Sequence, residues 1–325
     1  FAQWREFVDL EGRLAGWESF ESSSATPDVS PEALTAFVSG INQFAIALYR
    51  QLGMTRGNLF FSPFSIRTAL GMTYAGAKGP TMEEMAAVLH LPPPDELAHD
   101  AALATLLTRV HAAGGGKYEM TVANSLWAQE GSPGKAAYAE LMARNYGGGL
   151  FGTDFVLAAE AARQTMNEWV CETTRGRIRE LVPPGGVNED TRLVLVNAVH
   201  FKGTWSLRFR PERTSEQPFY LLDGGTVPAP LMFQEESVRY ARCDGFQAVD
   251  LGYEGGDLSM MVLLPDDRDG MPSLEQRLSA ELLQDCIGTM ASLKVELHIP
   301  RFTLEWGMVD VREGLSALGM PTAFT

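Results

Sequence analysis

Histidine, cysteine and serine are the side chains of this 325-residue chain that could act as nucleophiles, bases or metal ligands. Their spacing matches no catalytic motif, since there is no GxSxG, no HExxH, no P-loop and no GxGxxG after a predicted strand. The five histidines also lack the spacing of metal ligands; they are His90, His99, His111, His200 and His298. We interpret them as structural imidazoles and predict neither an enzyme nor a bound metal or other cofactor. A hydrolase assembled from distant residues stays open, without a motif to support it.

The three cysteines lie far apart in the sequence and form no CxxC pair. They are Cys171, Cys243 and Cys286. An odd number cannot complete a disulfide framework, so at least one is free or intermolecular. We interpret them as small apolar core residues.

The charge balance argues against two classes of partner. Lysine and arginine total 26 against 41 aspartates and glutamates, so the net charge is 26 − 41 = −15. Such a surface repels phosphate backbones and anionic lipids, and we predict no binding to nucleic acid or membrane. No apolar run reaches the ~18 residues that a membrane helix needs. The 45% hydrophobic content is typical of a globular chain and too high for a disordered one.

Hydrophobic periodicity predicts an amphipathic helix in residues 1–20, followed by a serine-rich linker. We therefore predict an N-terminal extension over 1–30 and one domain over 31–325. The extension either docks on a partner or membrane surface or packs on its own domain.

Capping signals predict where the first helices of the domain begin. Ser30-Pro31, Ser62-Pro63 and the pair Thr81 and Glu84 each mark a helix start. Further helices are predicted at 97–112, 159–171, 273–288 and 308–318, and strands at 120–129, 191–201, 258–264 and 293–302. The order shows no repeat and no regular βαβ alternation, which favours an α+β domain with a large sheet.

Several segments resemble, in the expected order, the motifs of the serpin (serine protease inhibitor) family. Residues 58–90 (NLFFSPFSIRTALGMTYAGAKGPTMEEMAAVLH) carry the Ser-Pro-x-Ser and Gly-Ala-Lys-Gly-x-Thr patterns. Similar segments follow at 123–129 (ANSLWAQ), 166–178, 193–205 (LVLVNAVHFKGTW), 208–214, 258–267, 297–306 and 315–324. The resemblance covers about residue 34 to the end. It implies the serpin fold, with a large central mixed β-sheet A, further sheets and about eight or nine surrounding helices.

The resemblance also implies a mechanical role for four residues. Ser62, Ser65 and Asn197 would form the shutter, where the strands of sheet A part, and Trp205 would mark the breach, where a loop first enters. Small hydroxyls at a helix start can bond backbone groups as strands separate. Simple helix capping is the alternative for Ser62, and aromatic packing is the alternative for Trp205. A buried amide such as Asn197 costs ~1–3 kcal/mol if it is unpaired.

The implied activity is inhibition of a serine endopeptidase by suicide trapping. A trypsin-, chymotrypsin- or subtilisin-like protease would cleave an exposed reactive loop and form an acyl-enzyme, and the cut loop would then insert into sheet A and distort the protease. Such an inhibitor must fold into a metastable state that is held by a barrier. The alternative is a non-inhibitory carrier or chaperone with the same fold, because fold does not fix function.

Serpins continue for several dozen residues beyond the position that matches Thr325, and the hinge, the reactive bond and further strands lie there. We therefore expect a separate or further segment to supply them, and we expect residues 1–325 alone to be an unstable monomer with an exposed apolar face. The stretch matching the heparin-binding region of some serpins, 91–113, is acidic with only Arg109 as a basic residue besides its histidines, so we expect no heparin binding. The start at Phe1 and the usual location of target proteases favour a secreted protein.

Overall fold

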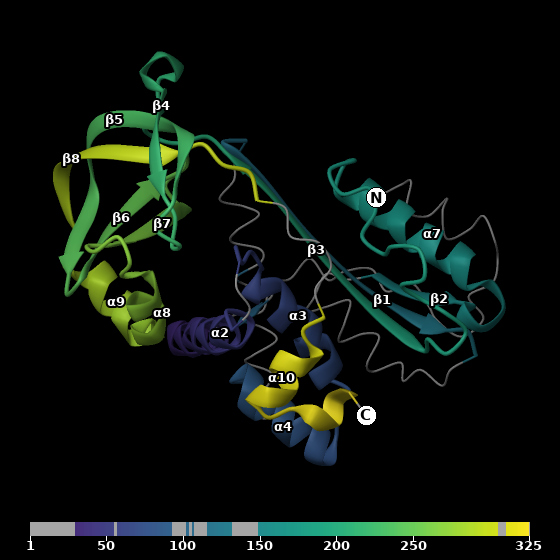
Figure 1. The fold of residues 1–325 in the computed structure, drawn as a ribbon. Helices are drawn as coiled ribbons and strands as arrows, with labels where there is room; N and C mark the ends of the chain where they lie inside the picture. Colours follow the sequence, from purple (N-terminus) through teal and green to yellow (C-terminus); the bar gives the residue numbers. More distant parts are fainter. Residues whose placement is uncertain are drawn as a thin grey trace.

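The computed structural model describes residues 30–54, 57–92, 102, 103, 106, 116–131, 149–304 and 310–324. It has an α+β architecture with two β-sheets (Figure 1). Figure 1 shows the five-stranded sheet at one end of the molecule and the three-stranded sheet with helix α7 at the other. Helices α2, α3, α4 and α10 gather between and below the sheets. The predicted extension 1–30 lies outside the described residues except for Ser30.

Seven α-helices lie in the described residues. They are α2 (Pro31–Leu52), α3 (Pro63–Tyr74), α4 (Gly79–Leu89), α7 (Phe155–Thr173), α8 (Met271–Arg277), α9 (Ala280–Thr289) and α10 (Arg312–Leu318), with 3-10 turns η1 (Pro211–Arg213) and η2 (Pro321–Phe324). Not one of these helices is long and apolar enough to cross a bilayer.

The predicted helix starts at Ser30 and Ser62 are confirmed. The Ser30 hydroxyl accepts a hydrogen bond from the Ala33 N–H, and the Ser62 hydroxyl accepts one from the Ser65 N–H, each at 3.2 Å. The start predicted at Thr81 was wrong. Helix α4 begins two residues earlier, at Gly79, because Pro80 is pre-set for the first turn, and the Glu84 carboxylate accepts hydrogen bonds from Thr322 instead of closing a capping box.

The single helix predicted at 273–288 is two helices. Ser279 separates them: its hydroxyl accepts a hydrogen bond from the Leu282 N–H at 3.1 Å and caps α9. A serine side chain can compete with the helix for backbone groups, so it ends one helix and starts the next. The helix predicted in 1–20 lies outside the described residues. Of the helix predicted at 97–112, only residues 102, 103 and 106 are described, and they are helical.

The three-stranded sheet has the order β2-β1-β3. Its strands are β1 (Tyr118–Gln129), β2 (Gly149–Thr153) and β3 (Leu193–Gly203). Strand β1 pairs with β2 in parallel and with β3 in the antiparallel sense, so the sheet is mixed, as expected. The predicted positions of β1 and β3 differ from the observed ones by only a few residues.

The five-stranded sheet is built around one long strand. Its members are β4 (Ser215–Tyr220), β5 (Thr226–Cys243), β6 (Phe246–Gly252), β7 (Ser259–Pro265) and β8 (Ala291–Pro300). Strand β5 has 18 residues and pairs with β4, β8 and β6 along successive parts of its length. The sequence predicted β7 and β8 but not β4, β5 or β6.

The two faces of the three-stranded sheet bury different side chains. Val194, Val196 and Ala198 of β3 face helix α7, where Trp127 and Met166 belong to the same apolar cluster. Alternate residues of a strand point to opposite faces. Leu195 accordingly packs on the other side, in a cluster with Phe37 of α2 and with Phe64, Ala69 and Met72 of α3.

Candidate functional site

Strand β3 is an edge strand in the described part of the chain. It pairs with β1 along 11 residue pairs, and no described strand pairs with its other side. An unpaired edge presents a row of N–H and C=O groups that can accept another strand. The free side of β3 is therefore a place where a further strand could add to this sheet.

A pair of asparagines lies in the middle of this strand pair. Asn124 of β1 is directly opposite Asn197 of β3, and the Asn197 Nδ2 donates a hydrogen bond to the Asn124 Oδ1 at 2.5 Å. Asn197 Oδ1 is buried and has no hydrogen-bond partner among the described residues. Asparagine is a poor strand residue, and a buried acceptor without a partner costs about 1–3 kcal/mol. The middle of the edge strand thus keeps one acceptor that an incoming donor could satisfy.

Helix α3 covers the same face of the strand as the two asparagines. Leu195 packs against α3, and Asn197, two residues further along β3, points to the same face. Ser62 and Ser65 lie in the first turn of α3, where they make the capping hydrogen bond described above. Within the described residues, no hydrogen bond joins either serine to Asn197. The structure therefore places the three predicted shutter residues on two facing elements, and their shutter role stays a prediction.

An aromatic stack holds the end of β3 that leads toward the five-stranded sheet. The rings of Trp205 and Tyr253 stack with centroids 4.4 Å apart and an interplanar angle of 13°, and Phe201 meets Tyr253 edge-on at 4.9 Å. A Cβ added at Gly203 would lie 2.7 Å from the Phe201 ring and 2.8 Å from the Tyr253 ring, so this position requires glycine. The structure shows the aromatic packing of Trp205, and its breach role stays a prediction.

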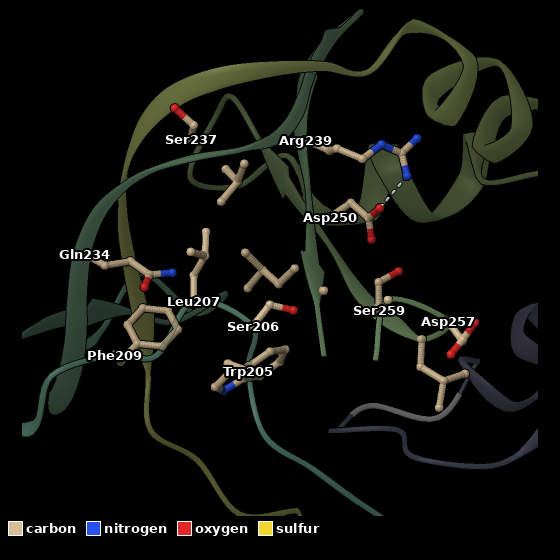
Figure 2. A pocket seen from close by; sticks show the side chains of 15 residues that line it. Trp205, Ser206, Leu207, Phe209, Gln234, Ser237, Arg239, Asp250, Asp257 and Ser259 are labelled. Carbon is tan, nitrogen blue, oxygen red and sulfur yellow. Dashed lines mark hydrogen bonds and ion pairs between the residues drawn. The ribbon is translucent and has the colours of Figure 1, made fainter. Parts of the chain in front are cut away.

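Trp205 also lines a cavity of about 470 Å³ (Figure 2). The cavity wall includes an ion pair between Arg239 and Asp250 at 2.6 Å, and these residues lie on β5 and β6. It also includes Gln234, which is 5% exposed and whose Oε1 has no hydrogen-bond partner among the described residues. The cavity beside the end of β3 thus has the polar side chains of Gln234, Arg239 and Asp250 in its wall.

Sequence reasoning missed two residues of this region, Asn124 and Tyr253. Asn124 lies in the segment ANSLWAQ, where it is a polar amide within a run of six buried residues, 123–128. The signal in the sequence was the amide itself, which is a poor strand residue. Tyr253 follows β6, and nothing near it in the sequence points to a stack with Trp205.

The histidines do not form a metal site in the described residues, where no group of three or more histidine, cysteine or acidic side chains could hold a metal ion. The ring of His298 packs on Phe233 with centroids 4.7 Å apart. The carbonyl of His90 accepts a hydrogen bond from Arg67, and burial, together with the Arg67 charge, lowers the pKa of the His90 ring. His99 and His111 lie outside the described residues.

A comparison with known protein families identifies the class to which this two-sheet fold belongs. The model of the family described as serpin (serine protease inhibitor) matches residues 39–325. The chain therefore belongs to the serpin family, and the resemblance noted from the sequence is confirmed.

Individual relatives and structures agree with this assignment. The chain is similar to an uncharacterized serpin-like protein of Thermococcus kodakarensis, with 39% identity over 88% of this chain and 66% of that protein. It is also similar to Antithrombin-III of Mus musculus, with 32% identity over 94% of this chain and 67% of that protein. Among solved structures, ovalbumin from emu (Dromaius novaehollandiae) matches with a TM-score of 0.84 and 30% identity, over 89% of this chain and 79% of that one. The chain thus spans about two thirds of the length of these two relatives.

Proposed function

We propose that the protein inhibits serine proteases by suicide trapping, in which a cleaved segment of the protein inserts beside β3. The observation that carries this proposal is the polar pair Asn124 and Asn197 in the middle of the β1–β3 strand pair, because a buried amide interrupts the apolar contacts between β3 and α3. Among the described residues the other side of β3 has no partner, and the cleaved segment would enter between β3 and the further strand that we expect on that side. Membership of a family described as serine protease inhibitors supports it. In this role the protein is a substrate-like inhibitor and not an enzyme.

The length of β3 sets the scale of the work that insertion can do. Its 11 residues could form on the order of 10 new backbone hydrogen bonds, each worth about 0.5–1.5 kcal/mol net. Loss of one oxyanion-hole donor already costs a protease about 3–4 kcal/mol of catalysis. Insertion at this edge therefore releases enough free energy to deform the active site of an attached protease.

The site residues would control when insertion begins. The stack of Trp205 on Tyr253 lies at the end of β3, so a segment that enters there must pass it first. Asn197 lies halfway along, where its free Oδ1 would meet a donor on the incoming strand. In this proposal the aromatic stack and the Asn197–Asn124 hydrogen bond, which must rearrange before Asn197 can pair with the incoming strand, are two successive barriers to insertion.

The decisive experiment mixes the complete protein, including any chain after Thr325, with trypsin, chymotrypsin and subtilisin. We expect a covalent complex that survives denaturing electrophoresis with at least one of them. The control is the same protease with its nucleophilic serine blocked, which cannot form an acyl-enzyme and should give no band. Cleavage by all three proteases without a covalent band would contradict trapping and favour the carrier or chaperone alternative.

We also propose that the protein is secreted and that heparin does not regulate it. The acidic stretch 91–113 lies mostly outside the described residues, so the argument for heparin rests on its composition and on the net charge of −15. Retention on a heparin column at physiological salt would contradict the second proposal. Finding the protein only inside cells that express its complete gene would contradict the first.

A further inference from the structure

Two cysteines that are far apart in the sequence meet at one end of the five-stranded sheet. Cys243 is the last residue of β5 and Cys286 lies in α9. Although the two residues are 43 positions apart, their Sγ atoms are 2.9 Å apart, within about 1 Å of the length of a disulfide bond. The third cysteine, Cys171, lies in α7 and makes no recorded contact with another cysteine in the described part of the chain.

The surrounding structure holds both cysteines in place. Cys243 pairs with Phe246 across a tight turn in which Gly245 has a φ of 79°, a conformation that favours glycine. Arg277, at the end of α8, donates from Nη2 to the Asp244 carbonyl in this turn at 2.9 Å. Helix α9 is anchored by its serine cap and by the burial of Cys286. The two sulfur atoms therefore face each other from two fixed elements.

The two thiols differ in their access to solvent. Cys286 is 2% exposed and packs in an apolar cluster with Phe246 and Leu274, whereas Cys243 is partly exposed at the border of that cluster. Burial, and then the neighbouring Cys243, raise the pKa of the Cys286 thiol to about 12. Since the thiolate is the reactive form, Cys286 is a poor first nucleophile, and a reagent in solution meets Cys243 first.

We propose that Cys243 and Cys286 form an intramolecular disulfide by exchange with a small-molecule disulfide, and that this bond links β5 to α9. The Cys243 thiolate attacks one sulfur of the reagent, and the other half of the reagent leaves as a thiolate. Cys286 then loses its proton to solvent and attacks the Cys243 Sγ, which releases the second half of the reagent. In sum, two protein thiols lose two electrons and two protons, and the reagent disulfide is reduced to two thiols.

The bond would close a loop that contains β6, β7, α8 and most of α9. Closing a loop of this length reduces the freedom of the unfolded chain, so the oxidised protein should resist heat better. This effect concerns the end of the molecule opposite the three-stranded sheet, and it does not depend on protease inhibition.

The first test uses the complete protein and oxidised glutathione as the reagent. After incubation at pH 8, the thiols are alkylated under denaturing conditions and the peptides are mapped by mass spectrometry. We expect the Cys243 and Cys286 peptides to be joined and only Cys171 to be alkylated. Three alkylated cysteines, a lasting glutathione adduct on Cys243, or a bond that includes Cys171 would each overturn the proposal.

The second test compares oxidised and reduced protein by thermal denaturation. We expect oxidation to raise the midpoint by at least about 4 °C in the wild type. The matched control Cys171→Ser should show the same rise, and Cys243→Ser should show none. Equal midpoints for oxidised and reduced wild-type protein would refute the proposed link, whether or not either variant folds.

Discussion

Strand β3 of the three-stranded sheet and strand β5 of the five-stranded sheet of this serpin differ in what surrounds them. Strand β3 has one neighbour in the described residues, and an asparagine pair interrupts its apolar contacts with α3. Strand β5 has three partner strands, and Phe246 of its partner β6 is fully buried in the cluster that also contains Ala241 of β5. The difference teaches that β5 is fixed along its whole length by its partner strands, whereas β3 carries polar groups beneath α3 that suit it to a rearrangement.

The largest change in the free energy of unfolding should come from a substitution in the five-stranded sheet. Phe246 is fully buried, so Phe246→Ala should lower the free energy of unfolding by about 3–5 kcal/mol through lost burial and a cavity. Denaturant titration of the complete protein measures this change. Phe219→Ala, on an exposed ring of β4, is the matched control and should cost far less. If Phe246→Ala also shortened the half-life of inhibitory activity as much as changes at the asparagine pair, the two sheets would not be functionally distinct.

A change in the three-stranded sheet should alter the rate at which inhibitory activity is lost. Asn197→Ala removes the donor to the Asn124 Oδ1 and should lower the barrier to spontaneous insertion or polymerisation by about 1–3 kcal/mol. Each 1.4 kcal/mol changes a rate about tenfold, so the activity half-life on warming should fall about 5- to 150-fold. Asn188→Ala, in an exposed loop, is the control. An unchanged half-life for Asn197→Ala would remove Asn197 from the shutter.

A serine caps one helix near each sheet, Ser62 at α3 and Ser279 at α9, so the same substitution can be made in both. Ser62→Ala and Ser279→Ala each remove a hydroxyl that caps a helix, and each should cost about 1 kcal/mol of unfolding free energy. Only Ser62 belongs to the helix that packs on β3. We therefore expect Ser62→Ala, and not Ser279→Ala, to shorten the activity half-life, measured by residual protease inhibition after warming. Equal half-lives would mean that Ser62 is only a cap.

The smallest expected effect tests a contact between α2 and α8, the second of which packs beside β7 of the five-stranded sheet. Tyr49 of α2 donates a hydrogen bond to Glu275 of α8 at 2.7 Å, and burial, with the nearby carboxylate, raises the pKa of Tyr49 to about 12. The unfolded value is near 10. Because the folded pKa is higher, the stabilisation is present below about pH 10 and is lost as the pH rises to about 12.

Denaturation midpoints between pH 9 and 12 measure this effect. Tyr49→Phe should flatten the decline relative to the wild type, whereas Tyr220→Phe, on an exposed residue of β4, should leave it unchanged. Identical profiles for the wild type and Tyr49→Phe would show that this contact does not couple protonation to folding.

Sequence by itself determined the family, the α+β class and most individual elements described here. Ser30 and Ser62 mark helix starts through capping, and the apolar run at 191–201 indicates β3, because these signals depend on neighbours only a few residues away. Helix α4 begins at Gly79, before the capping pair predicted at Thr81, because Pro80 favours the first turn. Ser279 divides the helix predicted at 273–288 into α8 and α9. These are local competitions in which two valid signals disagreed.

Tertiary structure alone decided which distant residues meet. The strand register puts Asn124 opposite Asn197, the bridge after β6 brings Tyr253 onto Trp205, and the docking of α9 on β5 brings Cys286 to Cys243. Periodicity reports which face of an element is buried, but not which element covers it. A one-residue slip of β3 along β1 would leave the apolar pattern of each strand intact and yet move Asn197 away from Asn124.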